Sequence, residues 1–230
     1  MKATGTEELK RAAAARALEF VTSGTVIGLG TGSTVRPLLA LLAERIAAGA
    51  LRDVVAVPTS EDTARRCRET GIPLTTLAEH PSLALAVDGA DEVSPRLDLI
   101  KGLGGALLRE KLVAQAARRF IVVADESKLV RRLGTRAPVP VEVVPFGWPI
   151  VMDRLKEFRA ECVLRRAGET PFVTNGGNYV VDCRFDTIAD AAELQAKLKA
   201  ITGVVETGLF IGLATEVIIG REDDVEILSR

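Results

Sequence analysis

Four short segments rich in glycine and polar residues could carry chemistry in this chain. They are Gly28–Thr34 (GLGTGST), Asp88–Glu92 (DGADE), Lys101–Gly105 (KGLGG) and Ala124–Lys128 (ADESK). Three of them follow short apolar runs that read as strands, and the segment at Lys101 opens a helical pattern. Because ligands bind outside the carboxyl ends of the strands of an open parallel sheet, we expect all four segments to converge on one rim.

Gly28–Thr34 has the features of an anion-binding turn. Its glycines allow close backbone approach, and a helix beginning at Ser33 or Thr34 would direct N–H groups and hydroxyls at a phosphate. A dinucleotide fingerprint matches less well, because its third glycine falls at Ser33 and Asp53 precedes the second strand, leaving only Glu61 for a ribose contact. No Gly-Lys-Ser/Thr completes a Walker pattern. A tight connection without a ligand is the competing interpretation.

The second segment places Asp88, Asp91 and Glu92 close together at the end of a strand. Such a cluster needs a compensating cation, water or metal, so one interpretation is a magnesium site. Another is an acid/base pair whose charge Lys101 compensates. A solvated acidic turn is the third. Glu110 lies in about the second turn of the helix after the glycine-rich segment, where it can face the same rim as Lys101.

The elements that must position these residues alternate between strands and helices through the first half of the chain. An alanine-rich helix comes first, and the later elements alternate regularly. Strands are expected at 25–29, 54–57, 83–87 and 120–123, and helices from Ser33 or Thr34 to Ile46, at 61–70 and at 106–119. This order predicts an α/β fold: a Rossmann-like parallel sheet with helices on both faces.

The pattern changes near Gly134, after which prolines cluster and the strands are shorter. Strands are expected at 141–144, 162–164, 172–174 and 179–183, with a hairpin turn at 175–178 and helices at 150–158 and 189–200. We therefore predict a smaller α+β, ferredoxin-like domain over residues 135–205. Residues 1–134 and 206–230 would form the Rossmann-like catalytic domain, to which the strand-like segment 214–220 returns.

Composition excludes several classes of function. Thirty basic and 31 acidic residues leave a net charge of -1, without the positive field of a nucleic-acid binder. We expect no membrane association and no signal peptide, and hence a cytoplasmic location. The single histidine, His80, excludes chemistry that needs several imidazoles. The three cysteines are far apart in sequence and read as buried apolar side chains.

Together, the four segments resemble those of the type A ribose-5-phosphate isomerases. The motifs GLGTGST at 28–34, VDGADE at 87–92, KGxGGALxREK at 101–111 and ADxSK at 124–128 occur in the order and at the spacing of that family. Two later stretches, PVEVVP at 140–145 and GVVETGLF at 203–210, also resemble it. The resemblance covers nearly the whole chain.

The resemblance implies that the chain interconverts D-ribose 5-phosphate and D-ribulose 5-phosphate by enediolate proton transfer, in the non-oxidative pentose phosphate pathway. Glu110 matches the family's proton acceptor, and Asp88 and Lys101 match the residues that assist at the substrate oxygens, with Asp91 in support. The substrate-binding stretches correspond to Thr31, Gly32, Ser33, Thr34, Asp88, Gly89, Ala90, Asp91, Lys101, Gly102, Leu103, Gly104 and Lys128. The family is commonly oligomeric, which implies a homodimer or homotetramer, with the smaller domain as a possible contact surface.

The residues themselves are sufficient for this reaction. Aldose–ketose isomerisation needs one base for the carbon-bound proton and groups that serve the two oxygens. Lys101 can supply the positive charge that a magnesium ion would otherwise provide, so we expect neither a cofactor nor a metal. Leu103 departs from the family, which commonly has glycine at that position.

Three other functions fit these residues less well. A sugar-phosphate sensor would not need Glu110, Lys101 and Asp88 together. An acyl or CoA transferase with Glu110 as its nucleophile would need room for a large thioester. A nicotinamide dehydrogenase is disfavoured by Ser33 and by the missing acid after the second strand.

Overall fold

The computed structural model describes residues 2–222 and 224–230, with side chains from residue 7 onward. The chain forms two compact units. The first contains the residues up to Ala90, Arg109–Lys128 and Gly212–Arg230, and the second contains Asp91–Leu108 and Leu129–Ile211. The chain therefore crosses between the units within the motifs at 87–92 and 101–111 and directly after Lys128.

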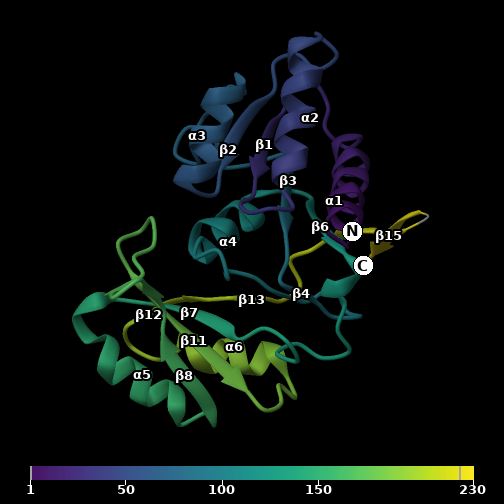
Figure 1. The fold of residues 1–230 in the computed structure, drawn as a ribbon. Helices are drawn as coiled ribbons and strands as arrows, with labels where there is room; N and C mark the ends of the chain where they lie inside the picture. The colour runs from purple at the N-terminus through teal and green to yellow at the C-terminus, as the bar shows by residue number, and fades with distance from the viewer. Residues whose placement is uncertain (1, 223) are drawn as a thin grey trace. The chain divides into compact units, whose positions relative to one another are not determined.

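A six-stranded sheet forms the centre of the first unit (Figure 1). Its strand order is β15-β14-β6-β3-β1-β2, and all neighbouring pairs are parallel except β14 and β15. Strands β3 and β6 are buried at every residue, as expected for a sheet covered on both faces. The strands are β1 (Val26–Leu29), β2 (Val55–Pro58), β3 (Leu85–Gly89), β6 (Phe120–Asp125), β14 (Glu216–Gly220) and β15 (Val225–Ser229).

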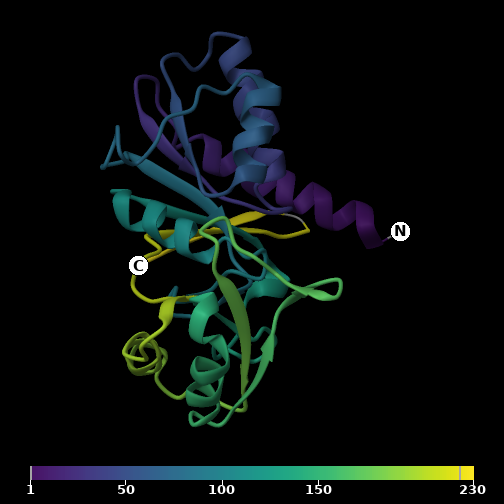
Figure 2. The ribbon, with the colours of Figure 1, turned by 90° about the vertical axis from the view of Figure 1, so that its left-hand side faces the viewer.

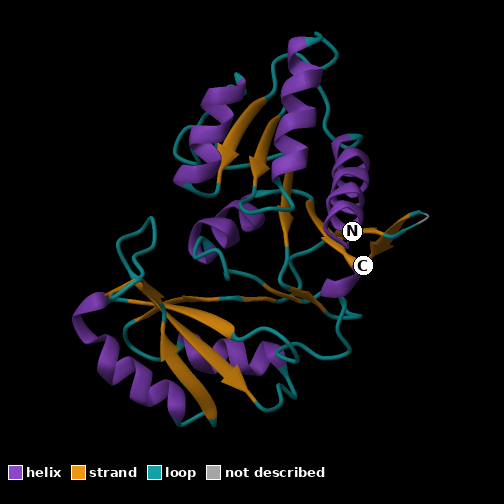
Figure 3. Ribbon diagram, in the orientation of Figure 1, coloured by secondary structure: helices purple, strands orange, loops and turns teal. Residues whose placement is uncertain are grey.

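Helices cover this sheet on both faces (Figure 3). Helix α1 (Lys2–Leu18) and α2 (Arg36–Ala47) share one buried cluster with Ile27 and Leu29 of β1. Gly28 faces the other way, where an added Cβ atom would lie 2.3 Å from the Val113 side chain of α4 (Leu107–Ala116). Helix α3 (Glu61–Thr70) follows β2, with Ser60 as its N-cap.

The strand order places a topological switch point between β1 and β3. Strand β2 lies on one side of β1, whereas β3, the next strand in sequence, lies on the other. Leu29, the last residue of β1, pairs with Val87, and β3 continues for two more residues to Gly89. The turn after β1 therefore leaves the sheet beside Asp88 and Gly89. Crevices at such points are where open α/β sheets bind ligands. The first unit therefore presents Gly30–Thr34 and Asp88–Ala90 at this position.

The second unit contains a four-stranded antiparallel sheet, ordered β12-β7-β11-β8, with two helices. Its elements are β7 (Val139–Val143), α5 (Trp148–Lys156), β8 (Ala160–Leu164), β11 (Tyr179–Phe185), α6 (Ala191–Lys199) and β12 (Val204–Thr207). This is the β-α-β-β-α-β order of ferredoxin-like folds. Buried side chains of both helices pack with Val139, Val141 and Val143, and Figure 2 shows the helices on one side of the sheet.

Smaller elements complete the second unit. Strands β4 (Glu92–Val93), β5 (Leu99–Ile100) and β13 (Leu209–Phe210) form a three-stranded antiparallel sheet. Strands β9 (Arg166–Ala167) and β10 (Thr170–Pro171) form a short hairpin, and the 3-10 helix η2 covers Pro145–Gly147. A second 3-10 helix, η1 (Glu126–Lys128), belongs to the first unit.

The predicted fold class is confirmed in both parts, and the differences are local. Helix α2 begins at Arg36 rather than at Ser33 or Thr34, because Gly32–Val35 form a turn in which Val35 N donates to Gly32 O at 3.2 Å. The predicted strand at 172–174 is reduced to a bridge at Val173, since Thr174 N closes the following turn with Asn178 O at 2.8 Å.

The compact units also divide the chain at other residues than the predicted domains. Residues 91–108, 129–134 and 206–211 lie in the second unit, although the prediction assigned them to the Rossmann-like domain. The small sheet β13-β5-β4 explains this placement, because it pairs residues near 92 and 100 with Leu209 and Phe210. The assignment of catalysis to one domain stays a prediction.

Two further observations bear on the composition argument. Within the described residues, no helix is long and apolar enough to cross a membrane. Cys67 and Cys183 are buried, whereas Cys162 is only partly buried, so the expectation of buried cysteines holds for two of the three.

Candidate active site

Asp88, the last residue but one of β3, is held by the turn that follows β1. Its Oδ1 atom accepts hydrogen bonds from Thr31 N at 3.1 Å and from Gly89 N at 2.7 Å, and the residue is 2% exposed. Gly30 must be glycine, because an added Cβ atom would lie 1.9 Å from Asp88 Oδ1. The turn and the carboxylate predicted from separate motifs are thus one unit of structure at the switch point.

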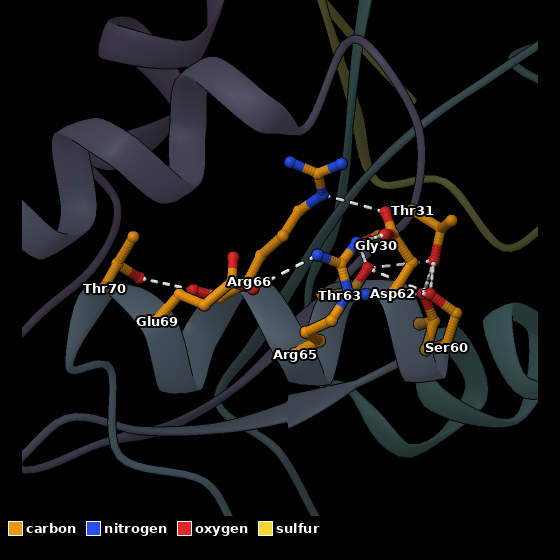
Figure 4. Close-up of polar contacts among 10 residues, drawn as sticks. Gly30, Thr31, Ser60, Asp62, Thr63, Arg65, Arg66, Glu69 and Thr70 are labelled. Atoms are coloured by element: carbon orange, nitrogen blue, oxygen red, sulfur yellow. Dashed lines mark hydrogen bonds and ion pairs between the residues drawn. The ribbon is translucent and has the colours of Figure 1, made fainter.

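The Thr31 side chain lies in a cluster of buried hydroxyl groups that sequence reasoning did not identify (Figure 4). Its Oγ1 atom is 2.8 Å from Thr59 Oγ1, 2.8 Å from Ser60 Oγ and 3.1 Å from Thr63 Oγ1. Thr63 Oγ1 also donates to Gly30 O at 2.8 Å. The start of α3 therefore fixes the turn after β1. Thr59 and Ser60 directly precede the acidic first turn of α3. This pattern is typical of a helix N-cap and could have indicated these residues from the sequence.

Lys10 of α1 is a second residue that the motifs did not indicate. Its Nζ atom donates to Ser33 Oγ at 3.3 Å and forms an ion pair with Glu7 at 3.0 Å. The Lys10 side chain is 12% exposed. Thr34 lies beside Gly89, where an added Cβ atom would be 3.4 Å from Thr34 Cβ. The predicted anion-binding turn thus contains the hydroxyls of Ser33 and Thr34, and the Lys10 ammonium group contacts the first of them.

In the second unit, Asp91 fixes the glycine-rich loop Gly102–Gly104. Its Oδ2 atom accepts a hydrogen bond from Leu103 N at 3.0 Å, and its own N–H donates to Ile100 O at 2.8 Å. Gly102 has a φ of 101° and would place an added Cβ atom 2.7 Å from Leu107 Cβ, so glycine is required there. Gly104 differs, because an added Cβ atom would meet nothing within 4 Å. Leu103 is 44% exposed.

Lys101 is a buried cation, 3% exposed, immediately before this loop. Its backbone N–H donates to Gly208 O at 2.9 Å, and its Nζ atom lies 5.5 Å from the centre of the Phe210 ring. An aromatic face compensates part of the cost of burying a positive charge. The second unit therefore holds Lys101, Asp91 and the loop as one arrangement.

The three acids predicted as a possible cluster have separate tasks. Glu92 is fully buried, and its carboxylate accepts from Gly134 N at 2.6 Å, Arg136 N at 2.5 Å and Ala137 N at 2.7 Å. It anchors the loop before β7. Among the residues that the structure describes, no three His, Cys, Asp or Glu side chains are arranged to hold a metal ion.

Glu110 and Lys128 belong to the first unit. Glu110 is 5% exposed and lies in the first turn of α4, one turn earlier than predicted, because the helix begins at Leu107. Lys128 ends η1, which Asp125 stabilises by accepting from Ser127 N at 3.0 Å. A buried carboxylate on a helix that lines a parallel sheet is costly unless it is compensated or used.

The predicted site residues therefore divide between the two units. The first unit brings together Thr31, Asp88, Gly89 and Thr34, and also holds Gly32, Ser33, Ala90, Glu110 and Lys128. The second brings together Asp91, Lys101, Gly102 and Leu103, and also holds Gly104. The convergence of all four segments on one rim stays a prediction.

Comparison with known proteins places this arrangement in a family. Residues 55–224 match the family described as ribose 5-phosphate isomerase A (phosphoriboisomerase A). The chain is 56% identical to the ribose-5-phosphate isomerase A of Roseiflexus castenholzii over 218 residues, 94% of this chain and 93% of that protein.

Solved structures agree with the sequence match. One is a D-ribose-5-phosphate isomerase in complex with phospho-erythronic acid, with a TM-score of 0.96, 41% identity and coverage of 98% of this chain and 99% of that one. Another is ribose 5-phosphate isomerase A from Methanocaldococcus jannaschii, with a TM-score of 0.93, 40% identity and coverage of 97% and 99%. The chain belongs to the ribose 5-phosphate isomerase A family.

Proposed function

We propose that this protein interconverts D-ribose 5-phosphate and D-ribulose 5-phosphate through an enediolate. The observation that carries the proposal is the burial of Asp88, Lys101 and Glu110, which are 2, 3 and 5% exposed. The resemblance of their motifs to the family implies that these three residues are its acid–base residues. Membership of the family over nearly the whole chain supports it. A similar protein binds phospho-erythronic acid, a phosphorylated hydroxy acid whose carboxylate resembles the two oxygens of an enediolate.

The proposed roles follow from the chemistry of the reaction. Glu110 removes the proton from C2 of the aldose and returns it to C1, which needs one carboxylate of suitable basicity. Lys101 stabilises the negative charge that develops on the oxygens. Asp88 moves protons at these oxygens. Its carboxylate is held in position by the two hydrogen bonds that Oδ1 accepts from Thr31 N and Gly89 N. Asp91 orients the loop through Leu103 N.

The phosphate group is assigned to the turn after β1. Ser33 and Thr34 supply hydroxyls, Gly32 supplies a backbone with a φ of 107°, and the remaining substrate contacts are assigned to Gly89, Ala90, Gly102–Gly104 and Lys128. Lys10 joins this set because its Nζ atom lies 3.3 Å from Ser33 Oγ. An ammonium group beside a serine hydroxyl is suited to a phosphate dianion.

The decisive experiment is an isomerase assay on the EDTA-treated protein with D-ribose 5-phosphate. We expect turnover without added metal, and loss of at least about a hundredfold in kcat for Glu110→Gln with KM little changed. Glu44→Gln, an exposed carboxylate on α2, is the matched control. Full activity of Glu110→Gln would refute the assignment of the base, and binding of the sugar phosphate without turnover would favour a sensor.

The remaining expectations concern assembly and location. We propose a homodimer or homotetramer that uses the second unit, because Val144, Phe146 and Ile150 are 36, 103 and 71% exposed within one short stretch of the chain. Sedimentation equilibrium of the protein and of Phe146→Ser tests this, and a monomeric parent protein would contradict it. We also propose a cytoplasmic location and a role in the non-oxidative pentose phosphate pathway.

A further inference from the structure

Arg165, next to the end of β8, holds the glycine-rich loop by its backbone. Its Nη1 atom donates to Gly102 O and to Leu103 O, each at 2.9 Å. The two carbonyl groups are consecutive in the chain, and the residue that grips them is more than sixty positions away in sequence. No motif of the sequence indicated this contact.

The Arg165 guanidinium is itself fixed in place. Its Nε atom donates to Asp182 Oδ2 at 2.9 Å and its Nη2 atom to Asp182 Oδ1, so the pair is bidentate. The side chain is 13% exposed, and its guanidinium carbon lies 5.8 Å from the centre of the Phe172 ring. A partly buried, planar and doubly anchored donor has little freedom to move, so it imposes its geometry on the loop.

Because the peptide bond is planar, holding a carbonyl oxygen also fixes the direction of the N–H group of the same peptide. In a trans peptide the C=O and the next N–H point in opposite directions. The peptide joining Gly102 to Leu103 is therefore clamped from both sides, by Arg165 on its oxygen and by Asp91 on its N–H. In the next peptide, Arg165 holds Leu103 O, and the Gly104 N–H points away from Arg165.

The surroundings of Gly104 suit a backbone donor. Its φ is not positive, and an added Cβ atom would meet nothing within 4 Å, so neither packing nor backbone conformation demands glycine at this position. The loop follows Lys101, to which we assigned the stabilisation of the substrate oxygens. A preoriented N–H group aimed at a developing oxyanion is among the strongest contributions that a backbone can make to catalysis.

We propose that Arg165 is a positioning residue of the isomerase: with Asp182, it orients the Gly104 N–H toward a substrate oxygen. This proposal rests on the function proposed above. Arg165 touches no reacting atom, and its effect passes entirely through the two carbonyl groups that it holds. The effect must therefore depend on the guanidinium fork rather than on positive charge alone.

The test compares Arg165→Met and Arg165→Lys with Arg166→Met, a control at the adjacent residue, which is exposed and contacts Glu169 O. We expect kcat/KM to fall roughly a hundredfold for Arg165→Met. We expect Arg165→Lys to be little better, because an ammonium cannot reproduce the fork. Arg166→Met should match the parent protein. Methylguanidinium added at millimolar concentration should restore part of the activity of Arg165→Ala, and it should not affect Arg166→Met.

Amide hydrogen exchange provides a readout that does not depend on turnover. The amides of Leu103, Gly104 and Gly105 should exchange faster in Arg165→Met than in Arg166→Met. If Arg165→Met folds poorly because Asp182 loses its partner, the double variant Arg165→Met/Asp182→Asn removes the stranded charge and the same measurements apply.

The outcomes separate this inference from the proposed function. An inactive parent protein would refute the isomerase assignment, whereas an active parent with an equally active Arg165→Met would refute only the role of Arg165. Loss of activity without rescue by methylguanidinium and without faster exchange in the loop would also overturn it, since the residue would then act through general stability.

Discussion

Gly30→Ala tests the central geometric claim about the site, that the turn after β1 and Asp88 at the end of β3 fit together as one unit. The added methyl group would lie 1.9 Å from Asp88 Oδ1, 2.1 Å from its Cγ and 2.6 Å from its Cβ. These atoms cannot all move away, because Asp88 is 2% exposed and Oδ1 already accepts two backbone N–H groups. Either the Asp88 carboxylate loses its backbone hydrogen bonds, or the turn after β1 moves away from β3.

Both outcomes have a calculable cost. Losing one hydrogen bond to a charged group costs about 1.5–3 kcal/mol, and overpacking of a close-packed region costs about 1–3 kcal/mol. The sum of roughly 2.5–6 kcal/mol corresponds to a fall in Tm of at least about 5 °C for a chain of this length. Turnover should be lost in the fraction that still folds, because Asp88 no longer occupies its position.

Differential scanning calorimetry and the isomerase assay check this prediction. For the calorimetry only, Gly104→Ala is the control for adding a methyl group at a loop glycine. An added Cβ atom at Gly104 meets nothing within 4 Å, so its Tm should equal that of the parent. A Gly30→Ala protein with unchanged Tm and unchanged kcat would refute the reasoning, because the contact between the turn and Asp88 could then not exist as described.

Three further predictions follow from named contacts. In Gly104→Ala, an unchanged Tm with a raised KM is expected if substrate approaches the loop, and unchanged kinetics would contradict the binding role of Gly104. Thr63→Val removes the hydroxyl that donates to Gly30 O at 2.8 Å and should lower the stability by about 1–3 kcal/mol. Thr70→Val on the same helix, where the hydroxyl contacts Arg66 O at the surface, should lower it much less in the same denaturation experiment. Contact with the Cys183 thiol, 3.5 Å between sulfurs, lowers the pKa of Cys162, whereas burial raises the pKa of Cys67 to about 11. A thiol reagent at pH 8 should therefore modify Cys162 first, reaction of Cys67 should require higher pH or unfolding, and a native protein that reacts first at Cys67 would contradict this order.

The parts of the fold that the sequence predicted are those specified by local pattern. The strand at 25–29, the helix 61–70 and, in the second unit, the strand at 179–183 and both helices follow from runs of apolar residues and from the turn residues between them. The turn at 175–178 was also predictable, because its sequence is Asn-Gly-Gly-Asn. In the structure Gly177 adopts a φ of 79°, and Asn178 O accepts a hydrogen bond from Thr174 N.

The parts that the sequence could not predict depend on pairing between distant residues. Sheet β13-β5-β4 joins two-residue strands whose patterns are too short to read, and it changes which unit residues 91–108 join. Thr31 meets Ser60 and Thr63 only because α3 begins beside β1. Lys10 reaches Ser33 from a helix in which the sequence indicated no functional residue. Such contacts need the topology before they can be inferred.

Burial of charge was the strongest structural signal for the site, yet it does not identify a catalytic residue by itself. Glu142 is 1% exposed, but its Oε1 atom accepts from Thr174 Oγ1 at 2.8 Å and from Asn178 Nδ2 at 2.9 Å, which fixes the hairpin turn. Glu92 is buried for a similar reason, because it accepts three backbone N–H groups. In both cases the contacts of the carboxylate anchor a loop by themselves.

For Asp88 and Asp91 we propose both an anchoring and a catalytic task, and this combination would distinguish the candidate site from a structural anchor. Each carboxylate receives backbone N–H groups that fix its orientation, through Thr31 and Gly89 for Asp88 and through Leu103 for Asp91. Each also lies against a turn or loop with a required glycine: Gly30 beside Asp88, and Gly102 in the loop that Asp91 holds. A chain that only needed to anchor loops would not need the carboxylates, the glycines and a buried Lys101 in consecutive segments. Preorganisation of charged groups by fixed backbone donors is what proton transfer through an enediolate requires, because no reorganisation energy is then spent as charge develops.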